Sequence, residues 1–224
     1  PIMRKYAEKC NADFIVLSQT VSAPIMLKDG AGIDQSYYRI LAIRDLFEKY
    51  DRILYLDTDM LINKNCPDLF DIVPEDKIGA VFEDVGSRIN DRMAKIRQMQ
   101  IEWNFIDWRN GYINEGCFLI SKKHKDIFLP HNNQYWVGWA GSQSHLSFNI
   151  NKLKFEVFEL SYRWNHMVMF SEPWNKDPDR FESNIIHYAG DGIWEKGIVM
   201  DKLEQAKRDY DVIYGNKNLE ENVK

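Results

Sequence analysis

The sequence predicts an α/β fold in which helices flank a mixed, mostly parallel central sheet. Apolar runs typical of strands alternate along the chain with segments whose apolar residues recur at helical spacing. The run ILYLDTDMLI, over residues 53–62, also places two carboxylates where a strand buried on both faces would leave its sheet. At 224 residues the chain can bury a sizeable core. We therefore expect one domain over residues 1–215, followed by a polar tail over residues 216–224.

The N-terminal part of the chain predicts a helix, a strand, a second helix and a second strand. Apolar residues recur at helical spacing over residues 1–10, and the run over residues 12–18 is typical of a strand. After a loop that contains Pro and Gly, Asp34 can cap the second helix, which leads into the strand before Asp57. This order is that of a βαβ unit, from which parallel sheets are built.

The rest of the chain continues to alternate helices and strands. The expected elements are, in order, a turn over residues 67–72, a strand over 78–83, a helix over 89–103, a strand over 112–121, a basic helix over 122–129, a helix over 143–153, a strand over 155–160, a short strand and a Gly-rich turn within 183–194, and a helix over 200–213.

Charge and cysteine content narrow the classes of function. The formal net charge is −5 and no basic stripe occurs outside Lys122 to Lys125, so nucleic acid is not an expected partner. Cys10, Cys66 and Cys117 have no paired spacing, which fits reduced thiols in a cytoplasmic setting. The apolar runs are all much shorter than a bilayer crossing needs, so no membrane span is expected.

Asp57 and Asp59 form the strongest candidate site. In an open α/β sheet, ligands bind outside the carboxyl ends of the strands, where these two side chains are expected. There they can reach a cation without being buried unpaired. Carboxylate oxygens are hard ligands that suit Mg²⁺ or Mn²⁺. The sequence therefore predicts a divalent cation site at residues 57–59.

With the helix and strand before it, Asp57-Thr58-Asp59 resembles the DxD region of nucleotide-sugar-dependent glycosyltransferases with the GT-A fold. It is similar in particular to the retaining family that includes glycogenin and the bacterial lipopolysaccharide galactosyltransferases. The segment YYRILAI, over residues 37–43, is similar to the family segment whose basic residue contacts the donor. The resemblance assigns that role to Arg39, which on its own would be interpreted as an exposed helix arginine.

Two further landmarks follow in the order of the family. Asn114-Glu115-Gly116 resembles the Asn-x-Gly strand end, where Asn bonds the donor sugar and Gly lets the backbone come close. A bulge that satisfies its own polar groups is the alternative. Gln143 matches a family Gln near the reacting carbon, whereas Ser142 replaces an acidic residue that often bonds the transferred sugar.

The C-terminal landmark is His187-Tyr188-Ala189-Gly190, which resembles the HxxG element of the family. Its His completes the metal shell, and its Gly gives an amide to the diphosphate. The element usually continues with a Lys that binds the diphosphate, but Ile193 stands at that position. Lys196 is the candidate substitute.

The resemblance implies a metal-dependent glycosyltransferase that moves a sugar from a nucleotide-sugar donor, with UDP preferred, to a carbohydrate or glycoconjugate acceptor with retention. It also implies a GT-A sheet without its first strand, because a single strand is expected before Arg39. The implied residues are Asp57, Asp59 and His187 for Mn²⁺ or Mg²⁺; Arg39, Asp57, Gly116, Gly190 and Lys196 for the donor; and Asn114 and Gln143 for catalysis.

Three alternatives stay open at this point. A truncated or degenerate glycosyltransferase could bind metal or sugar without turnover, as the departures at Ser142 and Ile193 suggest. In a phosphatase of the haloacid dehalogenase type, Asp57 would be the nucleophile and Asp59 the acid/base. The aromatic residues over 135–139 predict either a buried cluster or the lining of an acceptor groove.

Overall fold

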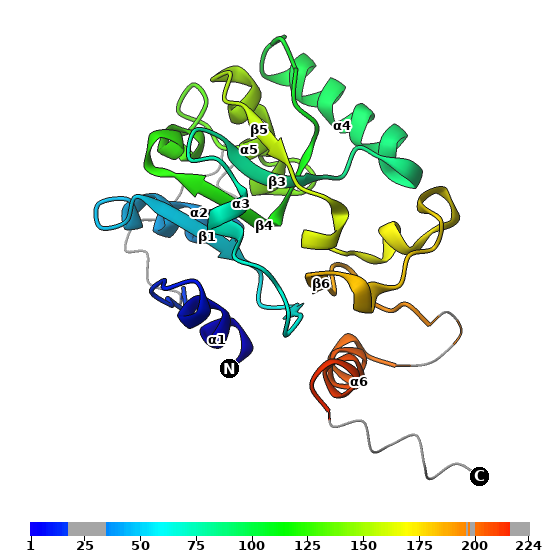
Figure 1. The fold of residues 1–224 in the computed structure, drawn as a ribbon. Helices are drawn as coiled ribbons and strands as arrows, with labels where there is room; N and C mark the ends of the chain where they lie inside the picture. The colour runs from blue at the N-terminus through cyan, green and yellow to red at the C-terminus, as the bar shows by residue number, and fades with distance from the viewer. Residues whose placement is uncertain (18–34, 196, 198–199, 216–224) are drawn as a thin grey trace, which may run out of the picture.

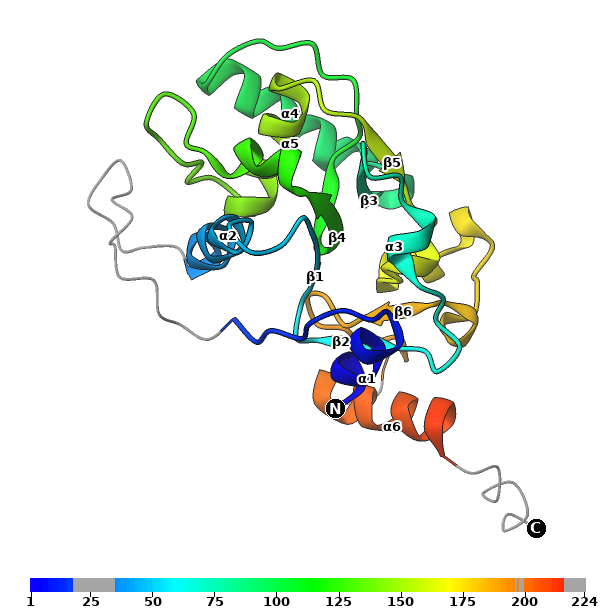
Figure 2. The same ribbon diagram turned by 60° about the vertical axis from the view of Figure 1, so that its left-hand side comes forward.

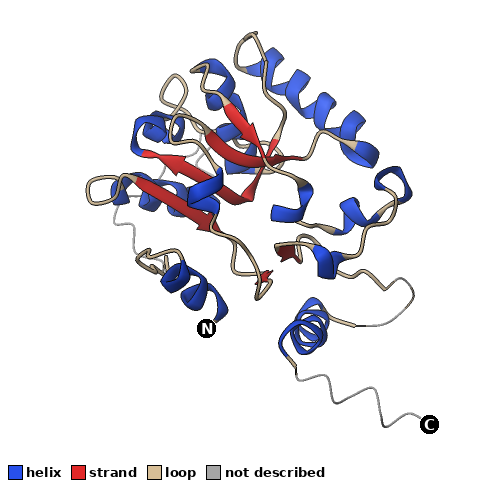
Figure 3. Ribbon diagram, viewed as in Figure 1, coloured by secondary structure: helices blue, strands red, loops and turns tan. Residues whose placement is uncertain are grey.

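The computed structural model describes residues 1–17, 35–195, 197 and 200–215, and shows helices around a four-stranded sheet with a two-stranded sheet beside it (Figures 1 and 3). The strands are β1 (Arg52–Leu56), β2 (Met60–Ile62), β3 (Ile78–Phe82), β4 (Ile113–Ser121), β5 (Val157–Glu159) and β6 (Ile185–His187). The α-helices are α1 (Ile2–Lys9), α2 (Gln35–Leu46), α3 (Leu69–Ile72), α4 (Ile89–Glu102), α5 (Gly141–Lys152) and α6 (Lys202–Tyr214). The 3-10 helices are η1 (Gly86–Arg88), η2 (Lys122–Phe128), η3 (Tyr162–Trp164), η4 (Val168–Ser171), η5 (Pro173–Asn175) and η6 (Arg180–Glu182).

The larger sheet is mixed and has the order β1-β4-β3-β5. β4 pairs antiparallel with β1 and β3, and β3 pairs parallel with β5, so β4 alone runs against the other three strands. Successive residues of β4 enter different cores because strand side chains alternate between faces. Cys117 and Leu119 pack into one core, Phe118 and Ile120 into the other. The expected mixed sheet flanked by helices is confirmed.

Helices cover the Phe118 face of this sheet, where Ile40 of α2 and Leu146 of α5 join the core. α4 packs on α5 through an aromatic cluster that includes Trp103, Trp136 and Phe148. Helices α1 and α6 lie beside the small sheet of β2 and β6 (Figure 2). No helix in the described part of the chain combines the length and the apolar character that a membrane span requires.

Three expected elements differ from the structure. The strand expected over residues 12–18 is wrong over 12–17. These residues form no regular structure, and Val16 is exposed. Residue 18 lies outside the described residues. Among the described residues no strand precedes β1. β1 itself is half-buried rather than buried on both faces, because it forms an edge of the sheet. The basic helix over residues 122–129 is the 3-10 helix η2.

Other elements need smaller corrections. The apolar run over residues 53–62 forms two strands in different sheets, β1 and β2, rather than one. The turn expected over residues 67–72 contains the one-turn helix α3, in which Asp68 caps the amide of Phe70. The Asp34 cap, Lys196 and the polar tail over residues 216–224 lie outside the described residues.

Candidate active site

The segment Asp57-Thr58-Asp59 joins the two sheets, and backbone hydrogen bonds tie it to both. The amide of Asp57 donates to the Gly116 carbonyl of β4 at 2.8 Å. The amide of Tyr188, which follows β6, donates to the Asp59 carbonyl at 3.0 Å. His187 lies opposite Met60 in the pairing of β2 with β6. This arrangement brings His187 to the two carboxylates, from which it is separated by 128 residues (Asp59) and 130 residues (Asp57) in the chain.

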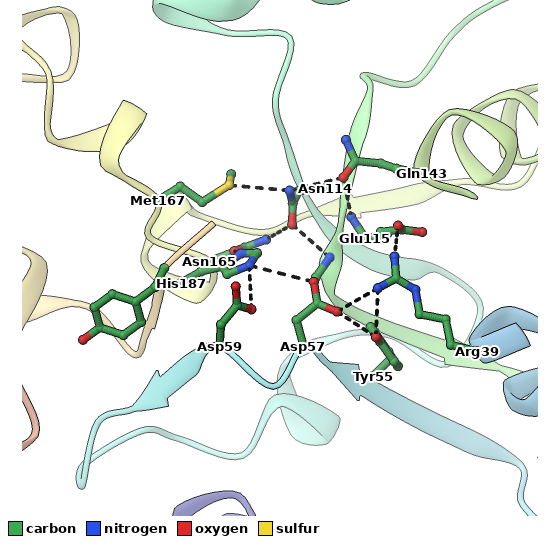
Figure 4. A network of polar contacts seen from close by, with 12 residues as sticks. Arg39, Tyr55, Asp57, Asp59, Asn114, Glu115, Gln143, Asn165, Met167 and His187 are labelled. Carbon is green, nitrogen blue, oxygen red and sulfur yellow. Dashed lines mark hydrogen bonds and ion pairs between the residues drawn. The ribbon is translucent and has the colours of Figure 1, made fainter. Parts of the chain in front are cut away.

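Asp57, Asp59 and His187, here called the metal triad, offer ligand atoms that all lie within 4.8 Å of one another (Figure 4). The Nε2 atom of His187 is 3.4 Å from Asp59 Oδ1 and 3.8 Å from Asp57 Oδ2. Neighbouring ligands of an octahedral ion held at about 2.1 Å are about 3 Å apart. The triad therefore fits one divalent cation after a small inward movement of its side chains.

Asn165 orients the imidazole of His187. The Nδ1–H group donates to Asn165 Oδ1 at 2.7 Å, and the Asn165 amide donates to Asn114 Oδ1 at 2.6 Å. Nε2 is thereby the nitrogen that faces the carboxylates. Metal-binding histidines commonly donate their second N–H in this way, which fixes the ring and strengthens the ligand.

Asp59 is flanked by two nitrogen groups. His187 approaches one carboxylate oxygen, and Lys202 Nζ bonds the other at 2.8 Å. The adjacent His187 imidazole, followed by the hydrogen bond from Lys202, holds the pKa of Asp59 well below its usual range. Lys202 also donates to the carbonyl of Tyr188 at 3.2 Å, so helix α6 begins directly beside the triad. Asp59 is thus ionised and ready to bind a cation.

Arg39 and Tyr55 hold the other carboxylate of the triad. Arg39 Nη1 lies 3.1 Å from Asp57 Oδ1, and the Tyr55 hydroxyl donates to the same oxygen at 2.7 Å. Since Oδ1 is occupied, Oδ2 is the oxygen of Asp57 that faces His187. The second terminal nitrogen of Arg39 forms a close ion pair with Glu115 Oε1.

Glu115 lies within the buried strand β4, beside Arg39 and Ser142. The Ser142 hydroxyl donates to Glu115 Oε1 at 2.8 Å. Burial raises the pKa of Glu115 to about 7, because the opposing effects of Arg39 and the Ser142 hydrogen bond only partly offset the loss of solvent. A buried carboxyl group is thus placed one residue from each of Asn114 and Gly116.

Asn114 and Gln143 belong to a second part of the same network. The Asn114 amide donates to Glu83 and to Gln143 Oε1, and Gln143 Nε2 donates to Glu83 Oε2 at 3.2 Å. Arg92 of α4 forms a buried ion pair with Glu83 at 2.7 Å. Both oxygens of Glu83 are therefore bonded, and the two amides have fixed positions.

Gly116 stands where the backbone of β4 approaches the metal triad. A Cβ atom there would lie 2.5 Å from His187 Cε1 and 2.9 Å from Asp57 Oδ2. Distances this short displace the neighbouring groups, so any side chain would disturb two of the three ligands. Gly190 differs: its φ is +68°, and a Cβ would meet no atom within 4 Å. Open space therefore surrounds its backbone.

Comparison with protein families decides the class of this site. The family model "Glycosyl transferase family 8" matches residues 28–194, which is most of the chain. The chain belongs to glycosyl transferase family 8. It is a glycosyltransferase, which decides against the haloacid dehalogenase alternative. No curated protein matches the sequence significantly.

Solved glycosyltransferases share the fold. A glycosyltransferase involved in the glycosylation of the major capsid of PBCV-1 is 13% identical, with a TM-score of 0.56, and the match covers 93% of this chain and 88% of that one. Apo-form GlyE of Streptococcus pneumoniae is 18% identical, with a TM-score of 0.54 over 94% of this chain and 48% of that one. These likenesses confirm a glycosyltransferase fold of the GT-A type.

The structure brings most of the expected residues of this family 8 enzyme together. Arg39, Asp57, Asp59, Asn114, Gly116, Gln143 and His187 lie in one connected set. The bulge alternative for Asn114 is only partly met, since its Oδ1 accepts from the Gly116 amide at 2.9 Å but its amide bonds Glu83 and Gln143. The individual roles of these residues stay predictions.

Within the aromatic stretch over residues 135–139, one tryptophan fits a buried cluster and the other is exposed. Trp136 is buried in the cluster with Trp103, as expected of core packing. Trp139 is 46% exposed, and the Arg92 guanidinium lies 4.3 Å from its ring centre. An acceptor contact by Trp139 stays a prediction.

Sequence reasoning missed Glu83, Asn165 and Lys202. Glu83 follows the apolar strand β3 directly, which is the same signal that identified Asp57. Asn165 and Lys202 stand in no motif, and only the folded chain brings them to His187 and Asp59. Glu115 was named only as the middle residue of a motif, although it is the buried partner of Arg39.

Proposed function

We propose that this glycosyltransferase moves a sugar from a UDP-sugar donor to a carbohydrate or glycoconjugate acceptor, with Mn²⁺ or Mg²⁺ held by Asp57, Asp59 and His187. The convergence of these ligand atoms within 4.8 Å, with His187 oriented by Asn165, carries the proposal. A bound dication would supply positive charge that stabilises the leaving nucleoside diphosphate. The resemblance to the retaining family supports UDP as the nucleotide.

Fixed positive charges on both sides of the triad support a diphosphate leaving group. Arg39 bonds Asp57 on one side, and Lys202 bonds Asp59 on the other. We assign to Lys202 the charge that the family pattern places at residue 193. Its Nζ atom lies beside the triad in the structure, whereas Lys196 is outside the described residues.

The amide of Gln143 would orient the sugar through its second Nε2 hydrogen. Glu83 and Asn114 hold Gln143 in place, so it can present this hydrogen bond without first becoming ordered. The absence of a side chain at Gly116 lets His187 and Asp57 pack against β4 in the positions that the metal requires. The space beside Gly190 that a Cβ would occupy is open, so a phosphate group could approach the backbone there.

The resemblance to the retaining family supports retention. The oxygens of Glu83 are already bonded to Arg92, Asn114 and Gln143, so Glu83 is not a free nucleophile for the anomeric carbon. We propose that the acceptor hydroxyl attacks on the face from which the diphosphate departs. The bond from the anomeric carbon to the phosphate oxygen breaks, and the hydroxyl proton passes to that oxygen.

We also propose that the enzyme acts in the cytoplasm. Cys10, Cys66 and Cys117 are free thiols, and two of them are buried. Unpaired cysteines are typical of proteins in reducing compartments.

Calorimetric titration of UDP with and without Mn²⁺ tests the metal site. Wild type should bind UDP only with Mn²⁺. Asp59→Asn should weaken that binding by at least about 100-fold, because it removes a carboxylate that binds the metal directly. Loss of a residue that only hydrogen-bonds to a metal ligand costs about 10- to 100-fold. Asp126→Asn, a control at an exposed position on η2 beyond the other end of β4, should bind like wild type.

UDP binding that survives chelation of all divalent cations, or no UDP binding at all, would contradict the proposal. Mn²⁺-dependent UDP binding without hydrolysis or transfer from any UDP-sugar would instead support the alternative of binding without turnover.

A further inference from the structure

One oxygen of Glu115 is buried without a partner. Glu115 is 7% exposed, and its Oε1 atom accepts hydrogen bonds from Arg39 and Ser142. Its Oε2 atom is buried and has no hydrogen-bond partner among the described residues. Native proteins rarely leave a buried carboxylate oxygen unsatisfied, because the group loses its hydration and receives nothing in return. Such an atom calls for a partner from outside the protein, either an ordered water or a bound molecule.

The neighbours of Glu115 match a molecule dense in hydroxyl groups. Arg39, Asn114, Glu115, Ser142 and Gln143, here called the polar cluster, present guanidinium, amide, carboxylate and hydroxyl groups connected by hydrogen bonds. Sugar hydroxyls both donate and accept, so they are recognised by such closely spaced polar groups. A nucleobase would instead be recognised largely by stacking on a flat face.

The polar cluster adjoins the metal triad through Asp57. Arg39 bonds Asp57 Oδ1, while Asp57 Oδ2 faces His187 (Figure 4). A diphosphate held by a cation at the triad would therefore place the group attached to it next to the cluster. In a nucleotide-sugar donor, one of the two groups attached to the diphosphate is the transferred sugar.

We propose that Glu115 accepts a hydrogen bond from a hydroxyl group of the transferred sugar and thereby helps to select the donor. This inference rests on the proposed function, since it requires a nucleotide-sugar donor at the triad. It assigns a specificity role to a residue between the two landmark positions Asn114 and Gly116.

The competing explanation is that Glu115 only holds Arg39 in place. Glu115→Gln separates the two explanations because it keeps the shape of the side chain and one carbonyl acceptor but removes the charge and the second acceptor. A residue that contacts the sugar affects donors that carry the sugar more than it affects UDP. A residue that holds Arg39 next to Asp57 affects both.

The test is calorimetric titration of UDP, UDP-glucose and UDP-galactose into Mn²⁺-loaded wild type and Glu115→Gln. We expect UDP affinity to change less than twofold, and affinity for the better-bound UDP-hexose to fall about tenfold, the effect of losing one hydrogen bond to a charged group. Equal affinities of the two proteins for that UDP-hexose would overturn the inference, as would an equal loss for UDP and UDP-hexose. Wild type that binds both UDP-hexoses no more tightly than UDP would also overturn it.

A second variant moves the carboxylate instead of removing it. Ser142 is one hydrogen bond from Glu115, so Ser142→Asp in the Glu115→Gln background returns a carboxylate to the same place. We expect the double variant to recover at least half of the lost UDP-hexose affinity on a logarithmic scale, with a melting temperature close to that of Glu115→Gln. No recovery in a folded double variant would show that Glu115 does not act through a carboxylate at this place.

Failure of the inference is distinguishable from failure of the proposed function. If wild type binds UDP only with Mn²⁺ but Glu115→Gln keeps full UDP-hexose affinity, the inference alone is wrong. If wild type binds UDP without any divalent cation, the metal-dependent function is wrong.

Discussion

The metal triad and the polar cluster share Asp57 as a boundary, yet they surround their carboxylates in opposite ways. The Asp59 side chain is 30% exposed, has a nitrogen group near each oxygen and a pKa held well below its usual range. Glu115 is buried, has one oxygen without a partner and a pKa raised to about 7 by that burial. The environment of Asp59 thus favours the ionised carboxylate, whereas burial of Glu115 favours the protonated form.

This contrast separates two requirements of a donor site. A cation ligand must be ionised at every working pH, and the groups around Asp59 ensure this. A group that recognises neutral hydroxyls needs a dry environment with fixed neighbours, which strengthens each hydrogen bond. Arg39 contacts carboxylates of both regions and connects the two.

Among changes that test this comparison, the largest expected effect comes from breaking the contact between the two regions at Asn165. Asn165→Leu removes the acceptor for His187 Nδ1–H and the donor to Asn114. We expect Mn²⁺ affinity to fall about 10- to 100-fold, as for loss of other outer partners of metal-bound histidines. Direct Mn²⁺ titration followed by electron paramagnetic resonance would measure the change.

Asn165→Asp is the matched control, because it keeps an acceptor for His187 Nδ1–H while a carboxylate oxygen replaces the donor to Asn114. Its Mn²⁺ affinity should stay within a fewfold of wild type. Equal Mn²⁺ affinities for wild type and Asn165→Leu would show that the imidazole needs no outer partner.

The pH dependence of stability should distinguish the two carboxylates. The folded-state pKa of Glu115 is raised from 4.5 to about 7, so its stabilising contribution is full below about pH 4.5 and is lost as the pH rises through 7. Gln at this position has no proton to lose. The unfolding free energy of Glu115→Gln relative to wild type should therefore rise between pH 5 and 8, by up to about 2 kcal/mol.

Asp59 should show no such change over that range. Its pKa is lowered in the folded state, so its contribution is present above the ordinary value of 3.8 and is lost only as the pH falls below it. Urea unfolding of wild type, Glu115→Gln and Asp59→Asn at pH 5, 6, 7 and 8 would measure both effects. Parallel curves for wild type and Glu115→Gln would contradict the burial argument.

The smallest expected effect comes from Lys202, whose side chain is 43% exposed. Lys202→Met removes a positive charge near the cation, so Mn²⁺ should bind as well as in wild type or slightly better. UDP affinity with saturating Mn²⁺ should fall about threefold to fivefold, as expected for an exposed charge pair. Both affinities are measured by calorimetry.

Lys207→Met, which changes an exposed lysine on the same helix, should leave both affinities unchanged. If Lys202→Met weakens Mn²⁺ and UDP binding alike, Lys202 contributes by holding α6 in place rather than by its charge.

The sequence predicted those parts of the molecule whose signals are local. Strands β3 and β4 were expected within a few residues of their bounds, because their apolar runs are strong, and helix α5 was expected within two residues of its bounds. Asp57 was found because a carboxylate directly after an apolar run is unusual. His187 and Gln143 were found only through the family resemblance.

The remaining features depend on contacts between distant parts of the chain. Lys202 meets Asp59 across 143 residues, and no local pattern identifies such a pair. The antiparallel insertion of β4 between β1 and β3 is likewise a property of the assembled sheet. Residues 12–17 have the composition of a strand, but they pair with no strand among the described residues and are irregular.

The position of Asp57-Thr58-Asp59 between two separate sheets has a mechanical consequence. One ligand follows β1 of the large sheet, another precedes β2 of the small sheet, and the third belongs to β6. An ion bound by all three would act as a cross-link between the sheets. Part of its binding energy would resist their separation, so slower amide hydrogen exchange at Met60, Leu61 and Ile186 would report a filled site even in the absence of any sugar.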